Sequence, residues 1–250
     1  DNPEAGEKFV RDLVDGPLTQ NQLAGLAAYF YAFGNDYVEI ALDTIESGLA
    51  YSQSIPESRT RLLMMKGGYL VEAKRYEESE RTFRMLAEET NSPLVQNNLA
   101  YVVGVYRNKP EEGLAIAKAA AKLAPRSPSI IDTVATMYHR TGEYQKAAES
   151  LEFLLQIDPT NSEAFAKLSL LYSDKLGEPE RGIVFAERGR SQSPRSPQVL
   201  DALGWSYYQT GKTAKGEEFL RKSLKYRVSP PTKLNTTVLK QPHHPEPTSV

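Results

Sequence analysis

The sequence predicts an all-α protein made of a row of similar helical hairpins, and three observations carry that prediction. Prolines close amphipathic runs at Pro125, Pro159 and Pro194, which stand 34 and 35 residues apart. Proline cannot continue a helix, so each of them marks a helix end. A glycine lies midway between successive prolines, where a left-handed cap and a tight turn are expected. The apolar residues between these points recur at helical spacing. Each unit is therefore predicted to be a helix, a turn, a second helix and a short connector.

The unit from 128 to 161 supports the hairpin residue by residue. Its turn glycine is Gly142, which is matched by Gly211 and, after one extra residue, by Gly177. The packed face of its first helix is predicted to hold Ile131, Val134, Ala135 and Tyr138, and that of its second helix Ala147, Leu151, Leu154 and Leu155. Small Ala135 and Ala147 should let the two helices approach closely, while larger neighbours fill the space beside them.

The stretch "IIDTVATMYHRTGEYQKAAESLEFLLQIDP" resembles the tetratricopeptide repeat (TPR). The family pattern of a large residue, Leu-Gly or Leu-Ala, Tyr, Gly, Ala, a bulky residue, Ala and Pro falls on Ile131, Val134-Ala135, Tyr138, Gly142, Ala147, Leu151, Leu154 and Pro159. It departs at Leu154, where the family prefers a small residue. The last unit, "LDALGWSYYQTGKTAKGEEFLRKSL", resembles the family through Leu203-Gly204, Tyr207, Gly211, Gly216 and Leu220.

The resemblance covers residues 20–228 and implies a right-handed α-solenoid of stacked antiparallel hairpins, with about five to six repeats. The expected repeats are 20–57, 58–92, 93–127, 128–161, 162–196 and 197–228. Residues 1–19 are expected to form a helix that caps the first hairpin, or the second helix of a truncated earlier repeat. Residues 229–250 hold five prolines and are expected to be a partly disordered tail.

Bulk composition leaves the compartment open and disfavours some functions. The chain of 250 residues has a net charge of -2 and no cysteine, so disulfides, thiolate metal sites and cysteine nucleophiles are excluded. The period permits a nucleic-acid-binding helical repeat, but the slightly acidic charge argues against one. No apolar run reaches the roughly 18 residues that span a bilayer. The sequence begins at Asp1 without methionine, so we expect a processed or excised chain, cytoplasmic, periplasmic or exported.

No set of residues predicts catalysis, a metal site or a cofactor. His139 is expected to be an ordinary surface or groove residue, and His243 and His244 a weak, incomplete metal site in the tail. The glycine-containing stretches do not resemble a phosphate loop. We therefore expect no enzyme activity, no cofactor and no bound metal.

The resemblance implies that the first helices line a concave face, and a stripe of residues spaced by four is expected there. The candidate partner-binding residues are Met64, Asn97, Asn98, Tyr101, Asp132, Thr136, Arg140, Leu170, Asp201 and Trp205. The asparagines could hydrogen-bond a peptide backbone, and the aromatic residues could give apolar contact. Because carboxylates outnumber Arg140 in this set, a neutral or basic ligand is expected. Ordinary alternatives stay open: Trp205 could pack between repeats, and Asp132 and Asp201 could cap their helices.

The leading hypothesis is a non-enzymatic module that holds a peptide or protein segment on its concave face. Two alternatives are a self-assembling array and the substrate-recognition arm of a longer enzyme or of a secretion or assembly complex. Some family members clamp the C-terminal carboxylates of chaperones with a basic set of residues. That set is absent from this stripe, so chaperone-tail binding is not expected.

Overall fold

The computed structural model describes residues 22, 25–27, 29, 38–51 and 56–227, and these residues form an all-helical array. The expectations for residues 1–19 and 229–250 lie outside the described residues. No strand occurs within the described residues. The predicted all-α solenoid is confirmed.

The helices alternate between first and second members of antiparallel pairs. The first helices are α4 (Pro56–Glu72), α6 (Pro93–Tyr101) continued by the π-helical turn η3 (Val102–Tyr106), α8 (Pro128–Arg140), α10 (Ser162–Leu170) continued by the π-helical turn η4 (Leu171–Lys175), and α12 (Pro197–Gln209). The second helices are α5 (Tyr76–Glu89), α7 (Pro110–Leu123), α9 (Tyr144–Ile157), α11 (Pro179–Gln192) and α13 (Thr213–Arg227), and α3 (Val38–Tyr51) precedes α4.

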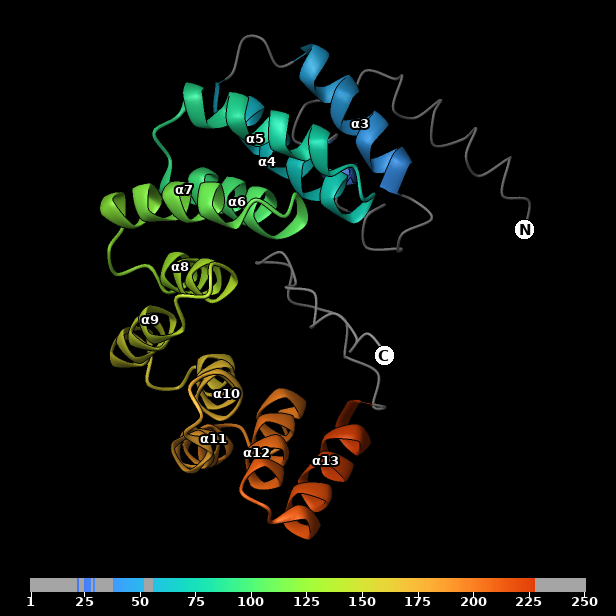
Figure 1. The fold of residues 1–250 in the computed structure, drawn as a ribbon. Coiled ribbons are helices and arrows are strands. Elements are labelled where there is room, and N and C mark those ends of the chain that lie inside the picture. The colour runs from blue at the N-terminus through green and yellow to red at the C-terminus, as the bar shows by residue number, and fades with distance from the viewer. Residues whose placement is uncertain (1–21, 23–24, 28, 30–37, 52–55, 228–250) are drawn as a thin grey trace, which may run out of the picture.

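The pairs follow one another along an open arc (Figure 1). Each second helix packs on its own first helix, and α5, α7, α9 and α11 also pack on the first helix of the next pair. The first helices α8 and α10 lie on the inner side of the arc, and α9 and α11 lie on its outer side. First helices of successive pairs also touch, as α6 does with α8 and α10 with α12. The inner face is therefore built by first helices.

Hydrophobic cores join neighbouring pairs into one array. One core contains Leu151 and Leu154 of α9 together with Leu168 of α10 and Tyr172 of η4. Leu154 is 1% exposed, so the bulky residue at a place where the family prefers a small one is fully packed. Burying such a side chain stabilises the fold by roughly 1.5–3 kcal/mol. Because each core draws on two pairs, a single hairpin could not bury its apolar face alone.

The turns within the pairs share one backbone device. A residue in the left-handed region follows each first helix, at Lys74, Asn108, Gly142, Gly177 and Gly211, with φ between 55° and 80°. These residues stand 34, 34, 35 and 34 positions apart. The amide that follows donates back to the first helix, as Glu143 N does to Tyr138 O at 2.8 Å. This is a helix C-cap that closes the first helix and redirects the chain.

The two π turns absorb the extra residue that the sequence shows before Gly177. From N-cap to left-handed residue, α6 and α10 run from 92 to 108 and from 161 to 177, whereas α8 and α12 run from 127 to 142 and from 196 to 211. The first two are one residue longer. An inserted residue in an α-helix is accommodated as a single π turn. The turns that follow therefore stay in step with those of the other pairs.

Tyrosines of the first helices link successive pairs through a set of contacts that we call an aromatic staple. The Tyr172 hydroxyl of η4 donates to Glu152 of α9 at 2.8 Å, and Arg181 of α11 stacks on the Tyr172 ring at 3.9 Å. Burial, and then the Glu152 carboxylate, raises the pKa of Tyr172 to about 12. Tyr207 repeats the device one pair later with Glu187 and Lys215. Each staple ties together three helices.

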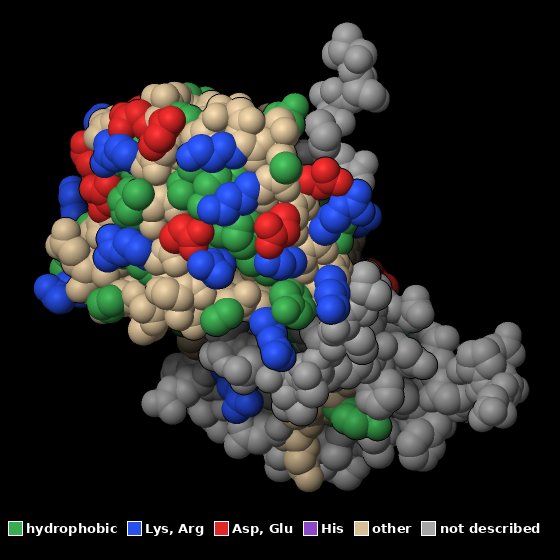
Figure 2. Space-filling model, turned by 90° about the horizontal axis from the view of Figure 1, so that it is seen from below, with side chains coloured by type: hydrophobic (Ala, Val, Ile, Leu, Met, Phe, Trp, Pro, Cys, Tyr) green, Lys and Arg blue, Asp and Glu red, His purple; other side chains and the backbone are tan. Residues whose placement is uncertain are grey.

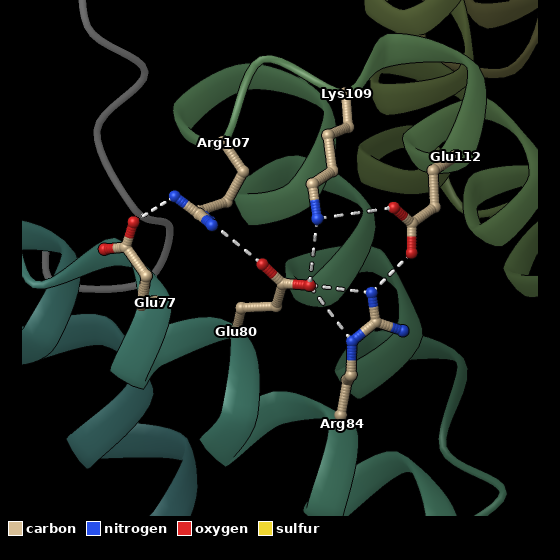
Figure 3. A network of polar contacts seen from close by, with 6 residues as sticks. All are labelled: Glu77, Glu80, Arg84, Arg107, Lys109 and Glu112. Atoms are coloured by element: carbon tan, nitrogen blue, oxygen red, sulfur yellow. Dashed lines mark hydrogen bonds and ion pairs between the residues drawn. The ribbon is translucent and has the colours of Figure 1, made fainter.

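A charged network ties α5 to the pair that follows it (Figure 3). At its centre, Glu80 is 9% exposed, and its carboxylate accepts from Arg84 at 2.8 Å and from Arg107 at 3.0 Å. Glu77, Lys109 and Glu112 complete the network. Burial opposes ionisation of Glu80, but the hydrogen bonds from Arg84 and Arg107 outweigh it and lower the pKa of its carboxyl group.

Candidate functional site

The predicted stripe follows the first helices. Its residues differ in whether their side chains are used in packing or are available to a ligand. Met64 packs against the core between α4 and α6, and Leu170 packs against the core around α12. Thr136 and Asn98 are half-buried, and Arg140 is exposed. Met64 and Leu170 therefore serve packing, at least in part. The polar and aromatic members carry more information about a ligand.

Asn97 has the most unusual environment in the stripe. Its side chain is 8% exposed, and its Oδ1 atom has no hydrogen-bond partner. The Oε1 atom of the preceding Gln96 is also buried without a partner. Leaving a buried acceptor unsatisfied costs roughly 1–3 kcal/mol, so such groups are rare in folded proteins. The sequence suggested Asn97 from its spacing, but nothing in it distinguishes the buried amide of Gln96.

Tyrosines gather one helical turn further along α6. The Tyr101 ring meets Tyr106 of η3 edge-on at 5.7 Å, and Tyr106 stacks on Tyr76 of α5 at 5.0 Å. Burial raises the pKa of Tyr101, and the nearby Tyr106 and Asp132 raise it further. Asn97 and Tyr101 are four residues apart and so lie on one face of α6. Together they place amide acceptors beside half-buried aromatic surface.

The charges of the stripe are already matched within the chain. Both carboxylate oxygens of Asp132 accept from Lys167 of α10, at 2.7 and 2.9 Å, and Arg227 of α13 pairs with Asp201. Burial disfavours the charged form of Lys167, but Asp132 and Glu163 outweigh it and raise the pKa of its ammonium group. Because both carboxylates are paired, they do not by themselves favour a basic ligand, and the expected preference for a neutral or basic ligand stays a prediction. Lys167 was missed because its partner lies 35 residues earlier in the sequence.

The hypothesis that Asp132 and Asp201 cap their helices is wrong. Helices α8 and α12 begin at Pro128 and Pro197, after the N-cap residues Ser127 and Ser196. The Ser196 side chain accepts from Val199 N, as a capping serine does. Both aspartates lie one turn inside their helices, where their partners are the cations of neighbouring helices.

Trp205 and Arg140 mark the remaining parts of the stripe. The half-buried Trp205 ring stacks on Tyr208 of the same helix at 5.7 Å, and Tyr208 is 53% exposed. Arg140 Nη2 donates to Asn108 Oδ1 at 2.9 Å and so connects α8 to the turn after η3. Trp205 thus presents aromatic surface at the far end of the stripe.

Among the described residues, no group of three or more His, Asp or Glu side chains is placed to hold a metal ion. Within the same residues, no helix is both long and apolar enough to span a bilayer.

Comparison with known proteins agrees with the repeat architecture. A family model described as "Tetratricopeptide repeat" matches residues 197–227. A Pseudomonas aeruginosa protein called "TPR repeat-containing protein PA4667" is 26% identical over 106 residues, which are 41% of this chain and 18% of that protein. A tetratricopeptide repeat protein from Parabacteroides merdae superposes with a TM-score of 0.67 at 13% identity, over 83% of this chain and 79% of its own. Residues 197–227 therefore match a tetratricopeptide repeat, and the described array has the fold of tetratricopeptide repeat proteins.

Other structural neighbours of this chain are structures of MamA. MamA from Desulfovibrio magneticus RS-1 has a TM-score of 0.58 at 17% identity, over 69% of this chain and 97% of its own. At such identity the likeness shows the fold alone. That Pseudomonas relative is a bacterial protein, and the chain spans less than a fifth of its length.

Proposed function

We propose that this TPR array is a non-enzymatic binding module that holds an extended peptide segment along the inner stripe. The observation that carries the proposal is the buried Oδ1 atom of Asn97, which has no partner in the chain. An extended peptide offers main-chain N–H donors that a side-chain amide oxygen can accept. Because this oxygen is buried, a segment reaches it only when the side chains that cover it move aside. A segment that does so would remove the cost of the unsatisfied acceptor, and that relief would add to its affinity.

The surroundings of Asn97 favour a segment that is neutral at this point. Asp132 and Lys167 neutralise each other, and Arg140 is held by Asn108. The rings of Tyr101 and Tyr106 offer apolar surface beside the amide, and tyrosine is enriched where binding energy concentrates. A segment with apolar side chains therefore fits the α6 part of the stripe better than a charged one.

The substitution Asn97→Leu separates a binding role from a structural one. Replacing an unsatisfied buried amide by an apolar group of similar size should raise the free energy of unfolding by about 1 kcal/mol. The same change removes the acceptor, so affinity for a bound peptide should fall by about tenfold.

The measurement needs peptides selected from a random display library on the full chain, with affinities determined by fluorescence anisotropy. Gln145→Leu on α9 makes the same kind of change on an exposed helix of the outer side and should leave affinity unchanged. The proposal fails if Asn97→Leu binds the selected peptides as well as the parent, or if it destabilises the fold.

End-to-end self-assembly through α13 is a weaker hypothesis. The exposed side of α13 carries the ion pairs Arg221–Glu217 and Lys222–Glu218. A polar outer face is typical of a terminal repeat that shields the array rather than extending it. Sedimentation over a range of protein concentrations tests this, and a mass that grows with concentration would revive the hypothesis.

A further inference from the structure

Basic residues are concentrated near the end of the described array. Residues 181–227 hold ten Lys or Arg and four Asp or Glu, a net charge of +6, whereas the rest of the chain carries -8. Figure 2 looks from below, toward the end of the arc that α12 and α13 form. Lys and Arg side chains are spread over this view, with fewer Asp and Glu among them. The charge is therefore segregated along the array.

Five of these cations lie on α13 or on the end of α11 and the connector that follows it, and we call them the basic end: Arg190, Arg195, Lys222, Lys225 and Arg227. The Phe219 ring lies under Arg190 at 5.7 Å and under Lys222 at 5.1 Å. Arg195, in the connector between α11 and α12, lies over Tyr226 at 6.0 Å. The aromatic rings hold these side chains in place, which lowers the entropy lost when they bind an anion.

The carboxylates within reach do not balance the basic end. Arg190 pairs with Glu187, Lys222 with Glu218 and Arg227 with Asp201. Within the described part of the chain, the exposed side chains of Arg195 and Lys225 form no ion pair. Arg195 also lines a shallow depression of about 440 Å³ with Ser193, Pro194 and Ser196. The surface thus offers the guanidinium of Arg195 and the ammonium of Lys225 to a ligand.

Stabilisation of helix C-termini does not account for this concentration. Basic residues in the last turn favour a helix by interacting with its dipole. Helices α5 and α9 have no basic residue in the last turn, whereas α11 has Arg190 and α13 has Lys225 and Arg227. The array therefore forms stable second helices without them.

We infer that the basic end is a second interaction surface, which docks an acidic segment of a partner protein. Guanidinium groups suit carboxylates because they donate two parallel hydrogen bonds. The net charge of -8 on the rest of the chain would repel an extended polyanion such as nucleic acid, which must run past the small basic end. A short acidic peptide meets the basic end without crossing that acidic surface.

The test uses the full chain and a short labelled peptide of alternating Glu and Gly as the probe. Binding should be measurable at low salt and weaken as the salt approaches about 150 mM, where charges are screened within about 8 Å. The variant Arg195→Glu/Lys225→Glu should weaken binding by about tenfold, because two attractive contacts become repulsive.

The chain provides a matched control. The connector after α7 reads Pro125-Arg126-Ser127-Pro128, and the connector after α11 reads Pro194-Arg195-Ser196-Pro197. The variant Lys122→Glu/Arg126→Glu therefore makes the same charge change in an equivalent place, and it should alter affinity by less than about twofold. If both variants lose affinity equally, net charge alone is responsible and the surface is overturned.

Two further outcomes would overturn the proposal. One is the absence of peptide binding by the parent chain at low salt. The other is binding to phosphatidylserine vesicles, but not to the peptide, with the same sensitivity to Arg195→Glu/Lys225→Glu, which would assign the surface to a membrane. Circular dichroism confirms that each variant is folded. If Arg195→Glu/Lys225→Glu is not folded, Arg195→Gln/Lys225→Gln takes its place, with a smaller expected loss of affinity of about threefold.

Discussion

The first helices of this array are of two kinds. Those of α6–η3 and α10–η4 hold one more residue and contain a π turn, whereas α8 and α12 are regular. Both kinds end at a left-handed residue and send the second helix back along the first. An inserted residue is therefore accommodated within the helix that contains it. The turn and the second helix that follow keep the same position relative to the next pair.

The π turn limits which side chains fit on the facing surface of the second helix in the same pair. A Cβ atom added at Gly113 of α7 would lie 2.6 Å from the Cα of Gly104, which belongs to η3. One added at Gly182 of α11 would lie 2.0 Å from the Oγ of Ser173, which belongs to η4. The regular α8–α9 pair has Ala147 at the matching place, fully buried. The regular α12–α13 pair also has glycine at the matching place, where a Cβ atom at Gly216 would lie 2.8 Å from the Gly204 oxygen. Glycine opposite a π turn therefore permits a close approach of the helices, but it is not confined to the pairs with a π turn.

Single-residue deletions should show the largest difference in stability between the two kinds of first helix. Deleting Thr136 from α8 would rotate the rest of that helix by about 100° and take Met137 and Tyr138 out of their cores, at a cost of more than about 4 kcal/mol. Deleting Val105 from η3 lets the π turn become regular helix, and the cost should stay below about 2 kcal/mol. Urea unfolding gives both values, and equal losses would show that η3 is not an absorbed insertion.

Substitution of the close-packed glycine should have the next largest effect. In Gly113→Ala the new methyl group meets backbone atoms, including the Ala100 carbonyl oxygen at 2.9 Å, which cannot rotate away. The expected loss is about 2–4 kcal/mol in the free energy of unfolding. The control Ala147→Gly in the regular pair should lose only about 1 kcal/mol, from helix propensity. A smaller loss for Gly113→Ala than for the control would contradict the close approach.

Much of this architecture follows from the sequence. Prolines and glycines set the period, because each acts through the local backbone and needs no tertiary context. Gly142, Gly177 and Gly211 do lie in the left-handed region. Lys74 and Asn108 take the same conformation. Asparagine is enriched in the left-handed region, whereas lysine gives no such signal. The extra residue before Gly177 was visible, but α and π turns bury the same kinds of side chain, so a π turn could not be predicted.

The candidate site was less accessible from sequence, because its decisive features depend on contacts between pairs. Spacing placed Asn97 and Tyr101 on one face of α6. Whether the Asn97 oxygen finds a partner depends on every side chain around it. The pairing of Asp132 with Lys167 joins two repeats, so a count of charges within the stripe did not include Lys167. Residues on one helix were predictable, and their partners were not.

The charged network beside η3 gives a pH-dependent prediction for a pair that contains a π turn. Arg107, directly after η3, binds the buried Glu80, whose pKa is lowered in the fold. A lowered carboxyl pKa stabilises the fold above the unfolded value of about 4.3, and this contribution is lost as the pH falls through the folded pKa. Glu80→Gln should therefore cost about 1–3 kcal/mol at neutral pH.

The difference between Glu80→Gln and the parent should shrink as the pH falls below about 4. Thermal unfolding at a series of pH values measures it. Glu149→Gln on the regular α9, where the carboxylate is exposed, should have little effect at any pH. A constant difference between Glu80→Gln and the parent across this range would exclude ionisation of Glu80 as the source of the stability.

The smallest expected effect concerns the caps, which differ between the two ends of the array. Lys74 holds a φ of 59°, whereas Gly142 holds a φ of 80° at the matching turn. A residue with a Cβ atom pays roughly 1–2 kcal/mol to adopt the left-handed conformation, and glycine does not. Glycine offsets part of this difference because its unfolded chain has more conformational entropy to lose. Lys74→Gly should therefore raise the free energy of unfolding by up to about 1 kcal/mol, and Gly142→Lys should lower it by about as much. Because a Cβ atom at Gly142 would meet no atom within 4 Å, the loss would come from the backbone alone. If Lys74→Gly is destabilising, the Lys74 side chain contributes more to the fold than its backbone strain takes away.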